Sequence, residues 1–234
     1  MTKGNILFDL DGTLTDYDYT NRYAIKCVYE RMNRVLTDEE YARFKLFEAN
    51  YWKQFEASDQ EQDSHGLSRI DYARSHIYQL LFDDDYIPLN LAYELMNIYI
   101  DNLGVENYVY DYVPEIVEEL SEYYNLYIAS NGPQGATERK LRNTDLLKYF
   151  KDIISSEQAG YSKPSPHYFE YVFNKLGIRP YNTIFIGDSI TSDIIGASNQ
   201  GMKTIWYNPN GLINRYDVQP NYEINSMEQL KKIL

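Results

Sequence analysis

The sequence predicts an α/β protein, a doubly wound parallel sheet with a small all-helical insertion after the first strand. Three apolar runs indicate buried strands, because each leads into a small polar turn and then a helical pattern; they end at residues 8, 129 and 186. Residues 17–109, by contrast, carry apolar side chains at helical spacing without a buried strand. With 234 residues, 44% of them hydrophobic, the chain can bury one sizeable core and a small second module. We therefore expect an α/β core from residues 1–16 and 110–234, and a helical domain from residues 17–109.

The first predicted strand ends in two carboxylates. Residues 5–16 read NILFDLDGTLTD, so Asp9 and Asp11 flank one leucine where the apolar run breaks into a glycine turn. Alternate strand residues face the same side, so both carboxylates can enter one site, where a cation, a shared proton or water must offset their repulsion. Mg²⁺ suits such a pair because it binds few carboxylates and retains water and phosphate oxygens. An ordinary solvated turn remains the alternative.

The second predicted strand leads into a turn that favours an anion. Ser130, Asn131 and Gly132 follow the run LYIA, and Pro133 begins a helical stretch through Leu141. A helix that starts this way presents unpaired backbone N–H groups to a phosphate. Ser130 adds a hydroxyl donor, and Gly132 has no Cβ to obstruct a ligand. Taken alone, this is also an ordinary capped turn.

A lysine precedes the next predicted helix. Lys163 stands just before Ser165, the expected N-cap, and Pro166, the expected first helical residue. A lysine on a constrained turn loses little freedom when its ammonium is aimed at a buried anion. The alternative is an exposed loop lysine, since lysines are rarely buried.

The last apolar run places further acids at the end of a strand. Asp188 follows Gly187 at the carboxyl end of the run, where open α/β sheets bind their ligands. Asp193 lies on the helical start that follows, and we expect it to hold Lys163 or a metal-bound water in place. A first-turn helix acid without that role is the alternative.

In this order the four motifs resemble those of the haloacid dehalogenase superfamily of phosphatases, whose core is Rossmann-like. The motifs are Asp9-Leu10-Asp11-Gly12-Thr13, Ser130-Asn131-Gly132, Lys163-Pro164, and Gly187-Asp188-Ser189 with Asp193. The resemblance covers residues 4–16 and 110–208, and it implies that the helical domain is a cap that closes over the substrate.

The resemblance also implies the chemistry of the acids. Asp9 would be the nucleophile that forms an aspartyl-phosphate, and Asp11 the general acid and base for the leaving group and the hydrolytic water. Mg²⁺ would be held by Asp9, Asp188 and the carbonyl of Asp11. An alkoxide needs a proton to leave and a halide does not, so the second acid favours phosphoryl transfer over dehalogenation.

The remaining motif residues would bind the phosphate. Ser130, Asn131 and Gly132 would form its binding turn, Lys163 would neutralise its charge, and Asp193 would act from the outer shell. In the cap, Tyr17 and Trp52 are candidates to stack on a substrate ring.

A short segment after the last motif bears on the substrate. Residues 205–211, IWYNPNG, are similar to a loop of pyrimidine 5′-nucleotidase-like members of the superfamily, which favours nucleoside 5′-monophosphates as substrates. A sugar-phosphate or phosphoglycolate phosphatase, or a β-phosphoglucomutase-like phosphomutase, would share every core residue. A binding module without turnover is a more remote alternative.

Charge and hydropathy exclude several partners. The net charge of −13 and the pI near 4.7 argue against a nucleic-acid or anionic membrane surface as partner. The chain has no apolar run long enough to span a bilayer, and the first strand begins too early for a cleaved signal peptide. We therefore expect a cytoplasmic protein, a monomer or small homo-oligomer, whose partner is a small-molecule phosphate monoester.

Overall fold

The computed structural model describes residues 3–56, 69–82 and 86–234. Contacts divide the chain into two compact units: unit 1 comprises Met1–Thr20 and Gly104–Leu234, and unit 2 comprises Asn21–Leu103. The assignment of residues 17–109 to a cap stays a prediction.

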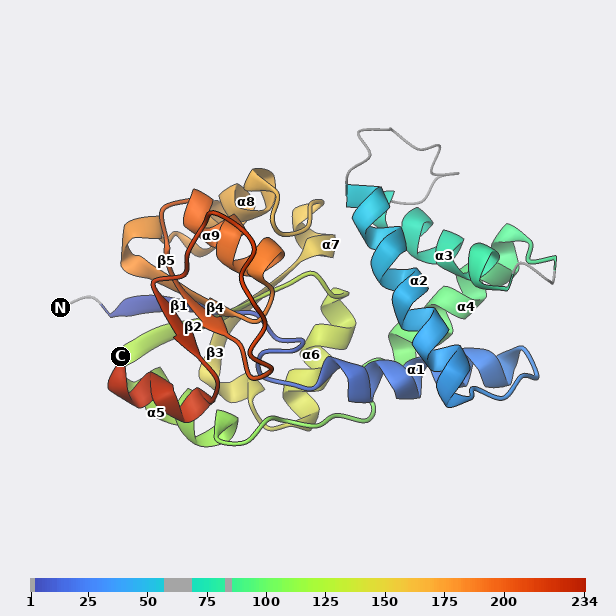
Figure 1. Cartoon of the computed structure of the whole chain (residues 1–234), viewed down its shortest axis with the longest axis horizontal. Helices are drawn as coiled ribbons and strands as arrows, with labels where there is room; N and C mark the ends of the chain where they lie inside the picture. The colour runs from blue at the N-terminus through green and yellow to red at the C-terminus, as the bar shows by residue number, and fades with distance from the viewer. Residues whose placement is uncertain (1–2, 57–68, 83–85) are drawn as a thin grey trace. The chain divides into compact units, whose positions relative to one another are not determined.

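Unit 1 is built on a six-stranded sheet with the strand order β3-β2-β1-β4-β5-β6 (Figure 1). Every pair of neighbouring strands is parallel. The strands are β1 (Gly4–Phe8), β2 (Tyr124–Ser130), β3 (Phe150–Ser155), β4 (Thr183–Gly187), β5 (Lys203–Tyr207) and β6 (Tyr222–Ile224). The predicted doubly wound α/β fold is confirmed. Since β1 lies between β2 and β4, where the strand order reverses, the carboxyl ends of these strands form the place where such sheets bind ligands.

Helices cover both faces of this sheet. On one face, β1 contributes Ile6 and Phe8 to a core shared with α5 (Val113–Tyr123), α6 (Gln134–Asn143) and the 3₁₀ helix η4 (Met227–Lys232). On the other, Leu7 packs in a core with α8 (Pro166–Leu176) and α9 (Gly196–Asn199). All three strand side chains are fully buried. Burial on both faces explains why this strand reads as a continuous apolar run rather than an alternating one.

Short elements complete unit 1 around the strand ends. The helix α7 (Ser156–Ala159) follows β3, and a π-helical turn, η3 (Ile190–Ile195), follows β4. The 3₁₀ turns η1 (Leu147–Tyr149) and η2 (Pro180–Asn182) precede β3 and β4. Ser165 is the N-cap residue of α8 and Pro166 its first residue, as predicted, although the Ser165 side chain makes no capping hydrogen bond.

The named elements in the described part of unit 2 are all helices. Its elements are the continuation of α1 (Tyr17–Arg31), which begins in unit 1, and α2 (Asp38–Glu56), α3 (Arg69–Leu81) and α4 (Leu89–Asn102). The start of α2 is a capping box, because Thr37 Oγ1 accepts from the Glu40 N–H while the Glu40 carboxylate accepts from the Thr37 N–H. Among the described residues, no helix combines the length and the hydropathy that a membrane crossing requires.

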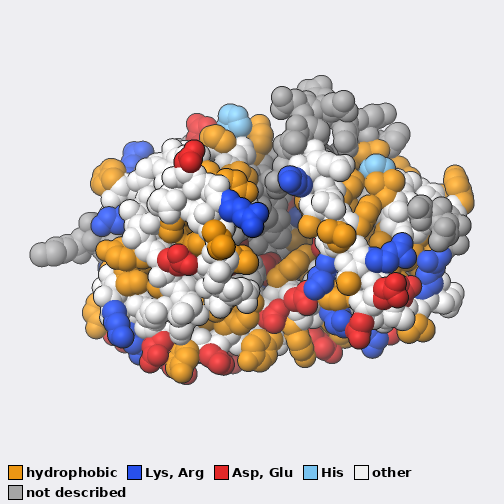
Figure 2. All heavy atoms as spheres, viewed as in Figure 1, with side chains coloured by type: hydrophobic (Ala, Val, Ile, Leu, Met, Phe, Trp, Pro, Cys, Tyr) orange, Lys and Arg blue, Asp and Glu red, His pale blue; other side chains and the backbone are white. Residues whose placement is uncertain are grey.

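The surface carries charges of both signs. On the face drawn in Figure 2, the Lys and Arg side chains of the described residues lie singly or in small groups among acidic and apolar side chains. The described residues drawn on this face in Figure 2 therefore form no continuous basic stripe of the kind that would follow a nucleic-acid backbone.

Candidate active site

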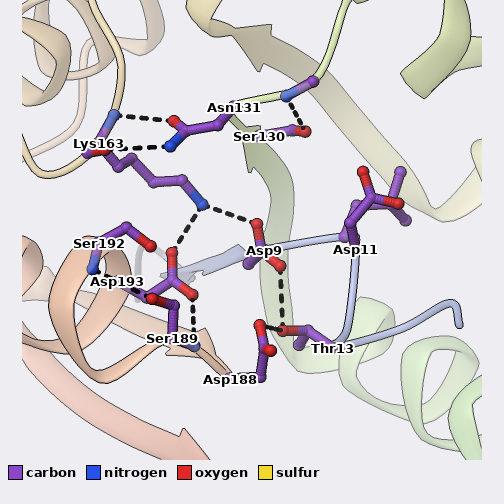
Figure 3. Close-up of polar contacts among 12 residues, drawn as sticks. Asp9, Asp11, Thr13, Ser130, Asn131, Lys163, Asp188, Ser189, Ser192 and Asp193 are labelled. Carbon is purple, nitrogen blue, oxygen red and sulfur yellow. Dashed lines mark hydrogen bonds and ion pairs between the residues drawn. The ribbon is translucent and has the colours of Figure 1, made fainter. Parts of the chain in front are cut away.

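Asp9, Ser130, Lys163 and Asp188, four of the predicted site residues, lie at the carboxyl ends of β1, β2 and β4 (Figure 3). Asp9 directly follows β1, Ser130 is the last residue of β2, and Asp188 directly follows β4. Lys163 reaches the same place from the segment before α8 (Figure 3). Asp9, Ser130 and Lys163 are buried. Residues distant in the sequence thus form one polar group inside unit 1.

Lys163 links two of the acids. Its Nζ lies 2.7 Å from Asp9 Oδ1 and 2.7 Å from Asp193 Oδ1. The other oxygen of Asp193 accepts a hydrogen bond from the Ser189 N–H at 3.0 Å. Both oxygens of this fully buried carboxylate therefore have partners, and Asp193 fixes the direction of the Lys163 ammonium, the contact expected from the sequence.

The side chain of Asn131, a residue of the predicted phosphate-binding turn, contacts the backbone of Lys163. Its side-chain Nδ2 donates to the Lys163 carbonyl at 3.0 Å, and its Oδ1 accepts from the Lys163 N–H at 2.8 Å. Since the amide uses both ends on one backbone residue, the Asn131 side chain holds the turn that carries Lys163. A contribution of Asn131 to phosphate binding through its backbone stays a prediction.

Thr13 and Gly12 connect Asp9 to Asp188. The Thr13 hydroxyl lies 3.1 Å from Asp9 Oδ2 and 3.2 Å from Asp188 Oδ1. Gly12 has a φ of +89°, and a Cβ at this position would lie 2.5 Å from Asp188 Oδ2. Only glycine combines this left-handed backbone with the space that the carboxylate needs.

Trp206, the second residue of the segment IWYNPNG, supports the same acid. Its ring is buried, and Nε1 donates to the backbone carbonyl of Asp188 at 2.7 Å. An indole N–H needs such a partner when the ring is buried. Trp206 therefore fixes the backbone of Asp188.

The single positive charge of Lys163 does not balance the three carboxylates of Asp9, Asp188 and Asp193. Burial raises the pKa of Asp9 well above its ordinary range; the Lys163 charge opposes this shift, and the charges of Asp193 and Asp188 add to it. Burial likewise raises the pKa of Asp188 to about 7, and the Asp193 charge adds to it. Burial would lower the pKa of Lys163, but the carboxylates of Asp193 and Asp9 raise it above its ordinary value. The lysine therefore stays charged, while burial disfavours the ionised forms of Asp9 and Asp188, and a further cation would offset this effect.

The donor set fits a hard divalent cation. Among the described residues, Asp9, Asp188 and Asp193 each offer a carboxylate oxygen, and these oxygens lie within 4.8 Å of one another. Carboxylate oxygens are the ligands that Mg²⁺ prefers. The sequence assigned the metal to Asp9 and Asp188 and placed Asp193 in the outer shell, and this division among the three acids stays a prediction. The predicted contribution of the Asp11 carbonyl stays a prediction.

The Asp11 carboxylate points away from this group of acids (Figure 3). Its Oδ1 lies 2.5 Å from Nζ of Lys140, a lysine on α6 whose side chain is only 2% exposed. The sequence reasoning missed this lysine. A signal was present, because Ala136, Thr137, Lys140 and Leu141 recur at helical spacing and form the buried face of α6.

The turn after β2 leads into α6 one residue later than predicted, because Pro133 is the N-cap residue and not the first helical residue. The Ser130 hydroxyl accepts from the Gly132 N–H at 2.9 Å, and α6 begins at Gln134 after Pro133. The Gln134 N–H, however, donates to a carboxylate oxygen of Glu157 at 2.9 Å. A carboxylate thus already uses one of the first N–H groups of α6, the type of donor that the sequence assigned to phosphate.

The two aromatic candidates belong to different units. Tyr17 lies in unit 1, where its ring centroid is 5.6 Å from Nζ of Lys140. Trp52 lies in unit 2, where its ring meets that of Tyr51 edge to face with centroids 5.8 Å apart. Contact of either ring with a substrate stays a prediction.

Comparison with known proteins gives a consistent result. The model of the family described as haloacid dehalogenase-like hydrolase matches residues 6–207. The HAD-hydrolase YfnB of Bacillus subtilis is 30% identical over 230 residues, which cover 98% of this chain and 94% of YfnB. A crystal structure of YfnB bound to magnesium superimposes with a TM-score of 0.84 at 29% identity, covering 100% of this chain and 99% of that one.

Two further relatives carry named activities. The pyrimidine 5′-nucleotidase PynA of Streptococcus pneumoniae is 30% identical, over 96% of this chain and 92% of its own. A glyceraldehyde 3-phosphate phosphatase of Pyrococcus furiosus is 26% identical, over 98% of this chain and 92% of its own. Both relatives align with this chain over almost its whole length.

Proposed function

Because the chain belongs to the haloacid dehalogenase-like hydrolase family, we propose that it is a Mg²⁺-dependent phosphomonoesterase that acts through an aspartyl-phosphate on Asp9. The observation that carries this proposal is the ion pair of the buried Asp9 with Lys163, beside Asp188 and Asp193. The cytoplasmic location expected from the sequence stays a prediction.

Asp9 is the proposed nucleophile. A carboxylate needs no base to activate it, but it must be ionised and must approach an anionic phosphate. Lys163 supports both requirements, since its ammonium lies 2.7 Å from Asp9 Oδ1 and can also face phosphate oxygens. Mg²⁺ held by Asp9, Asp188 and the Asp11 carbonyl would supply the remaining positive charge.

Other residues of unit 1 bind and orient in this proposal. Ser130 and the backbone of Gly132 bind the phosphate at the end of β2, where a Cβ at Gly132 would come 3.1 Å from Ser130 Oγ and crowd the turn. Asn131 and Asp193 hold the Lys163 backbone and ammonium in place. Precise placement of such charges is the main source of catalysis in phosphoryl transfer.

Asp11 is the proposed general acid and base. It would donate a proton to the leaving alkoxide in the first step and accept one from the hydrolytic water in the second. Its carboxylate lies apart from Asp9, as an in-line displacement requires, because the attacking and leaving oxygens stand on opposite sides of the phosphorus. A dehalogenase would have no use for this acid.

We propose nucleoside 5′-monophosphates as the leading substrate class. The pyrimidine 5′-nucleotidase of Streptococcus pneumoniae, which aligns over nearly the whole chain, supports this choice. A small sugar phosphate is the second candidate, favoured by the similarity to the glyceraldehyde 3-phosphate phosphatase of Pyrococcus furiosus. Phosphomutase activity and a binding role without turnover are the remaining alternatives.

One assay separates these activities. Purified protein is given p-nitrophenyl phosphate with Mg²⁺, with EDTA, and with Mg²⁺ in the Asp9→Asn variant. We expect turnover only in the first condition, and a rate loss of about 10⁴-fold or more in the variant. A set of nucleotides and sugar phosphates, ranked by kcat/KM, then identifies the substrate class.

The outcomes of this assay are distinct. Metal-independent turnover, or full activity of Asp9→Asn, would contradict the proposed mechanism. No turnover of any ester would favour a binding module. Release of free phosphate without a bisphosphate primer argues against a phosphomutase.

A further inference from the structure

Lys140 is a buried cation that the proposed mechanism does not yet use. It lies on α6, and its side chain is only 2% exposed. Its Nζ is 2.5 Å from Asp11 Oδ1, whereas the Nζ of Lys163 forms ion pairs with Asp9 and Asp193. Burying an ammonium is costly unless a charged partner compensates it, so this ion pair determines where both side chains point.

The surroundings hold the Lys140 side chain in one direction. Gly104 packs against its stem: a Cβ at Gly104 would lie 2.7 Å from Lys140 Cγ, and φ is +83° there. The Tyr17 ring lies beside the ammonium, with its centroid 5.6 Å from Nζ. A cation near an aromatic face is attracted by the ring, which adds to the restraint.

The two oxygens of Asp11 meet different surroundings. Oδ1 contacts the Lys140 ammonium, while Oδ2 is 3.5 Å from the position that a Cβ would take at Gly132. Gly132 belongs to the Ser130–Gly132 turn, the proposed phosphate site. One oxygen is thus held by a cation, and the other lies near Gly132 of the proposed phosphate site.

We propose that Lys140 is the positioning residue of Asp11, holding Oδ1 so that Oδ2 is the atom that exchanges the proton with the leaving group. This inference rests on the proposed phosphatase function and assigns a residue to it. In the first step Asp9 bonds to phosphorus, the bond from phosphorus to the ester oxygen breaks, and that oxygen takes the proton from Asp11 Oδ2. In the second step a water oxygen bonds to phosphorus, the bond from phosphorus to the Asp9 carboxyl oxygen breaks and releases the Asp9 carboxylate, and Oδ2 takes the water proton.

The ammonium of Lys140 contributes most when Asp11 becomes charged. As Asp11 gives up its proton, negative charge develops on a carboxylate whose Oδ1 is 2.5 Å from Nζ. An interaction that strengthens in the transition state accelerates the reaction, whereas one of constant strength does not. The effect of Lys140 should therefore scale with the need of the leaving group for a proton.

Leaving-group dependence gives the test. Lys140→Met removes the charge and keeps an apolar stem, Lys140→Arg keeps the charge, and Lys148→Met is the control, since Lys148 is an exposed lysine of the same unit. Each variant is assayed with p-nitrophenyl phosphate, whose phenolate leaves without a proton, and with ethyl phosphate, whose alkoxide does not. Thermal unfolding by circular dichroism confirms that each variant is folded.

For Lys140→Met we expect kcat/KM to fall about 10²-fold with ethyl phosphate and at most about 3-fold with p-nitrophenyl phosphate, since general acid catalysis is typically worth 10²–10⁴. Lys140→Arg should recover most of the loss, Lys148→Met should match the wild type, and competitive inhibition by inorganic phosphate should be unchanged. If Lys140→Met does not fold, Lys140→Gln takes its place with the same expectation.

Equal losses with both esters, or no loss with either, would overturn the role of Lys140 and leave the proposed function intact. A wild-type protein that hydrolyses neither ester would instead refute the proposed function, and the role of Lys140 with it. The two failures are thus distinguishable.

Discussion

The two units of this chain bury different kinds of side chain. Unit 1 buries charges at the carboxyl edge of its sheet: Asp9, Lys140, Lys163 and Asp193. In the described part of unit 2, Arg74 is the buried charged residue, and aromatic pairs such as Tyr29 with Phe82 and Tyr78 with Tyr99 fill the interior. Buried charges are costly and persist where they do chemistry, whereas packed rings provide shape. This difference agrees with the proposal that the reacting residues lie in unit 1, and a role of unit 2 in selecting the substrate stays a prediction.

Removal of the Lys163 ammonium should have the largest effect on both stability and turnover. Lys163→Met leaves the buried carboxylates of Asp9 and Asp193 without their cation, and breaking such a pair costs about 3 kcal/mol. We expect the free energy of unfolding to fall by that amount in urea titrations, and kcat to fall about 10³-fold for every substrate. Lys175→Met, an exposed lysine on α8, is the control. A loss of kcat with only some substrates would mean that Lys163 acts in substrate selection, and it would contradict the proposed difference between the two units.

Substitution of Trp52 tests whether unit 2 contributes to substrate recognition. If this ring of unit 2 stacks on a nucleobase, Trp52→Ala should lower kcat/KM for uridine 5′-monophosphate about 10-fold, because base stacking is worth about 1–3 kcal/mol. Turnover of p-nitrophenyl phosphate should change far less. Equal losses with both substrates would leave Trp52 as a packing residue of α2.

The acids of unit 1 predict a smaller effect of pH on stability. The pKa of Asp188 is raised from 3.8 to about 7, so the folded protein keeps a proton that the unfolded chain loses at lower pH. The stability that this proton contributes is fully present below the pKa of Asp188 in the unfolded chain, and it is lost as the pH rises from about 4 to about 7. Without metal, we expect Tm to fall by about 3–6 °C between pH 5 and pH 8.

Added Mg²⁺ should reverse this loss. The Tm increase on adding MgCl₂ should be larger at pH 8 than at pH 5, because protons and the cation compete for the same carboxylates. Asp188→Asn removes one titrating group and should weaken the pH dependence, to which Asp9 also contributes. A magnesium effect of equal size at both pH values would argue against metal binding by Asp188.

Most of the fold and the centre of the site could be predicted from the sequence because they depend on local patterns. Apolar runs that end in polar turns locate Asp9, Ser130 and Asp188 at strand ends, and parallel strands bring those ends to one edge. The order of the four motifs identified Lys163 as a site residue, although no local sequence pattern indicates that its side chain is buried.

The remainder depends on tertiary packing. The contact of Lys140 with Asp11 requires knowing which face of α6 is buried and what lies opposite it. The Asn131 amide has two ends, and only the folded chain brings the Lys163 backbone to both. For Tyr17 and Trp52, sequence position gives no sign that they belong to different units.

The central claim is that Asp9 carries the phosphoryl group. Protein mixed with substrate and Mg²⁺ is quenched in acid within milliseconds and reduced with borohydride, which converts an aspartyl-phosphate to homoserine, and the peptide around residue 9 is read by mass spectrometry. If Asp9 forms the aspartyl-phosphate, we expect homoserine at position 9, dependent on substrate and absent in Asp9→Asn. Homoserine at another acid, or none during rapid turnover, would contradict it.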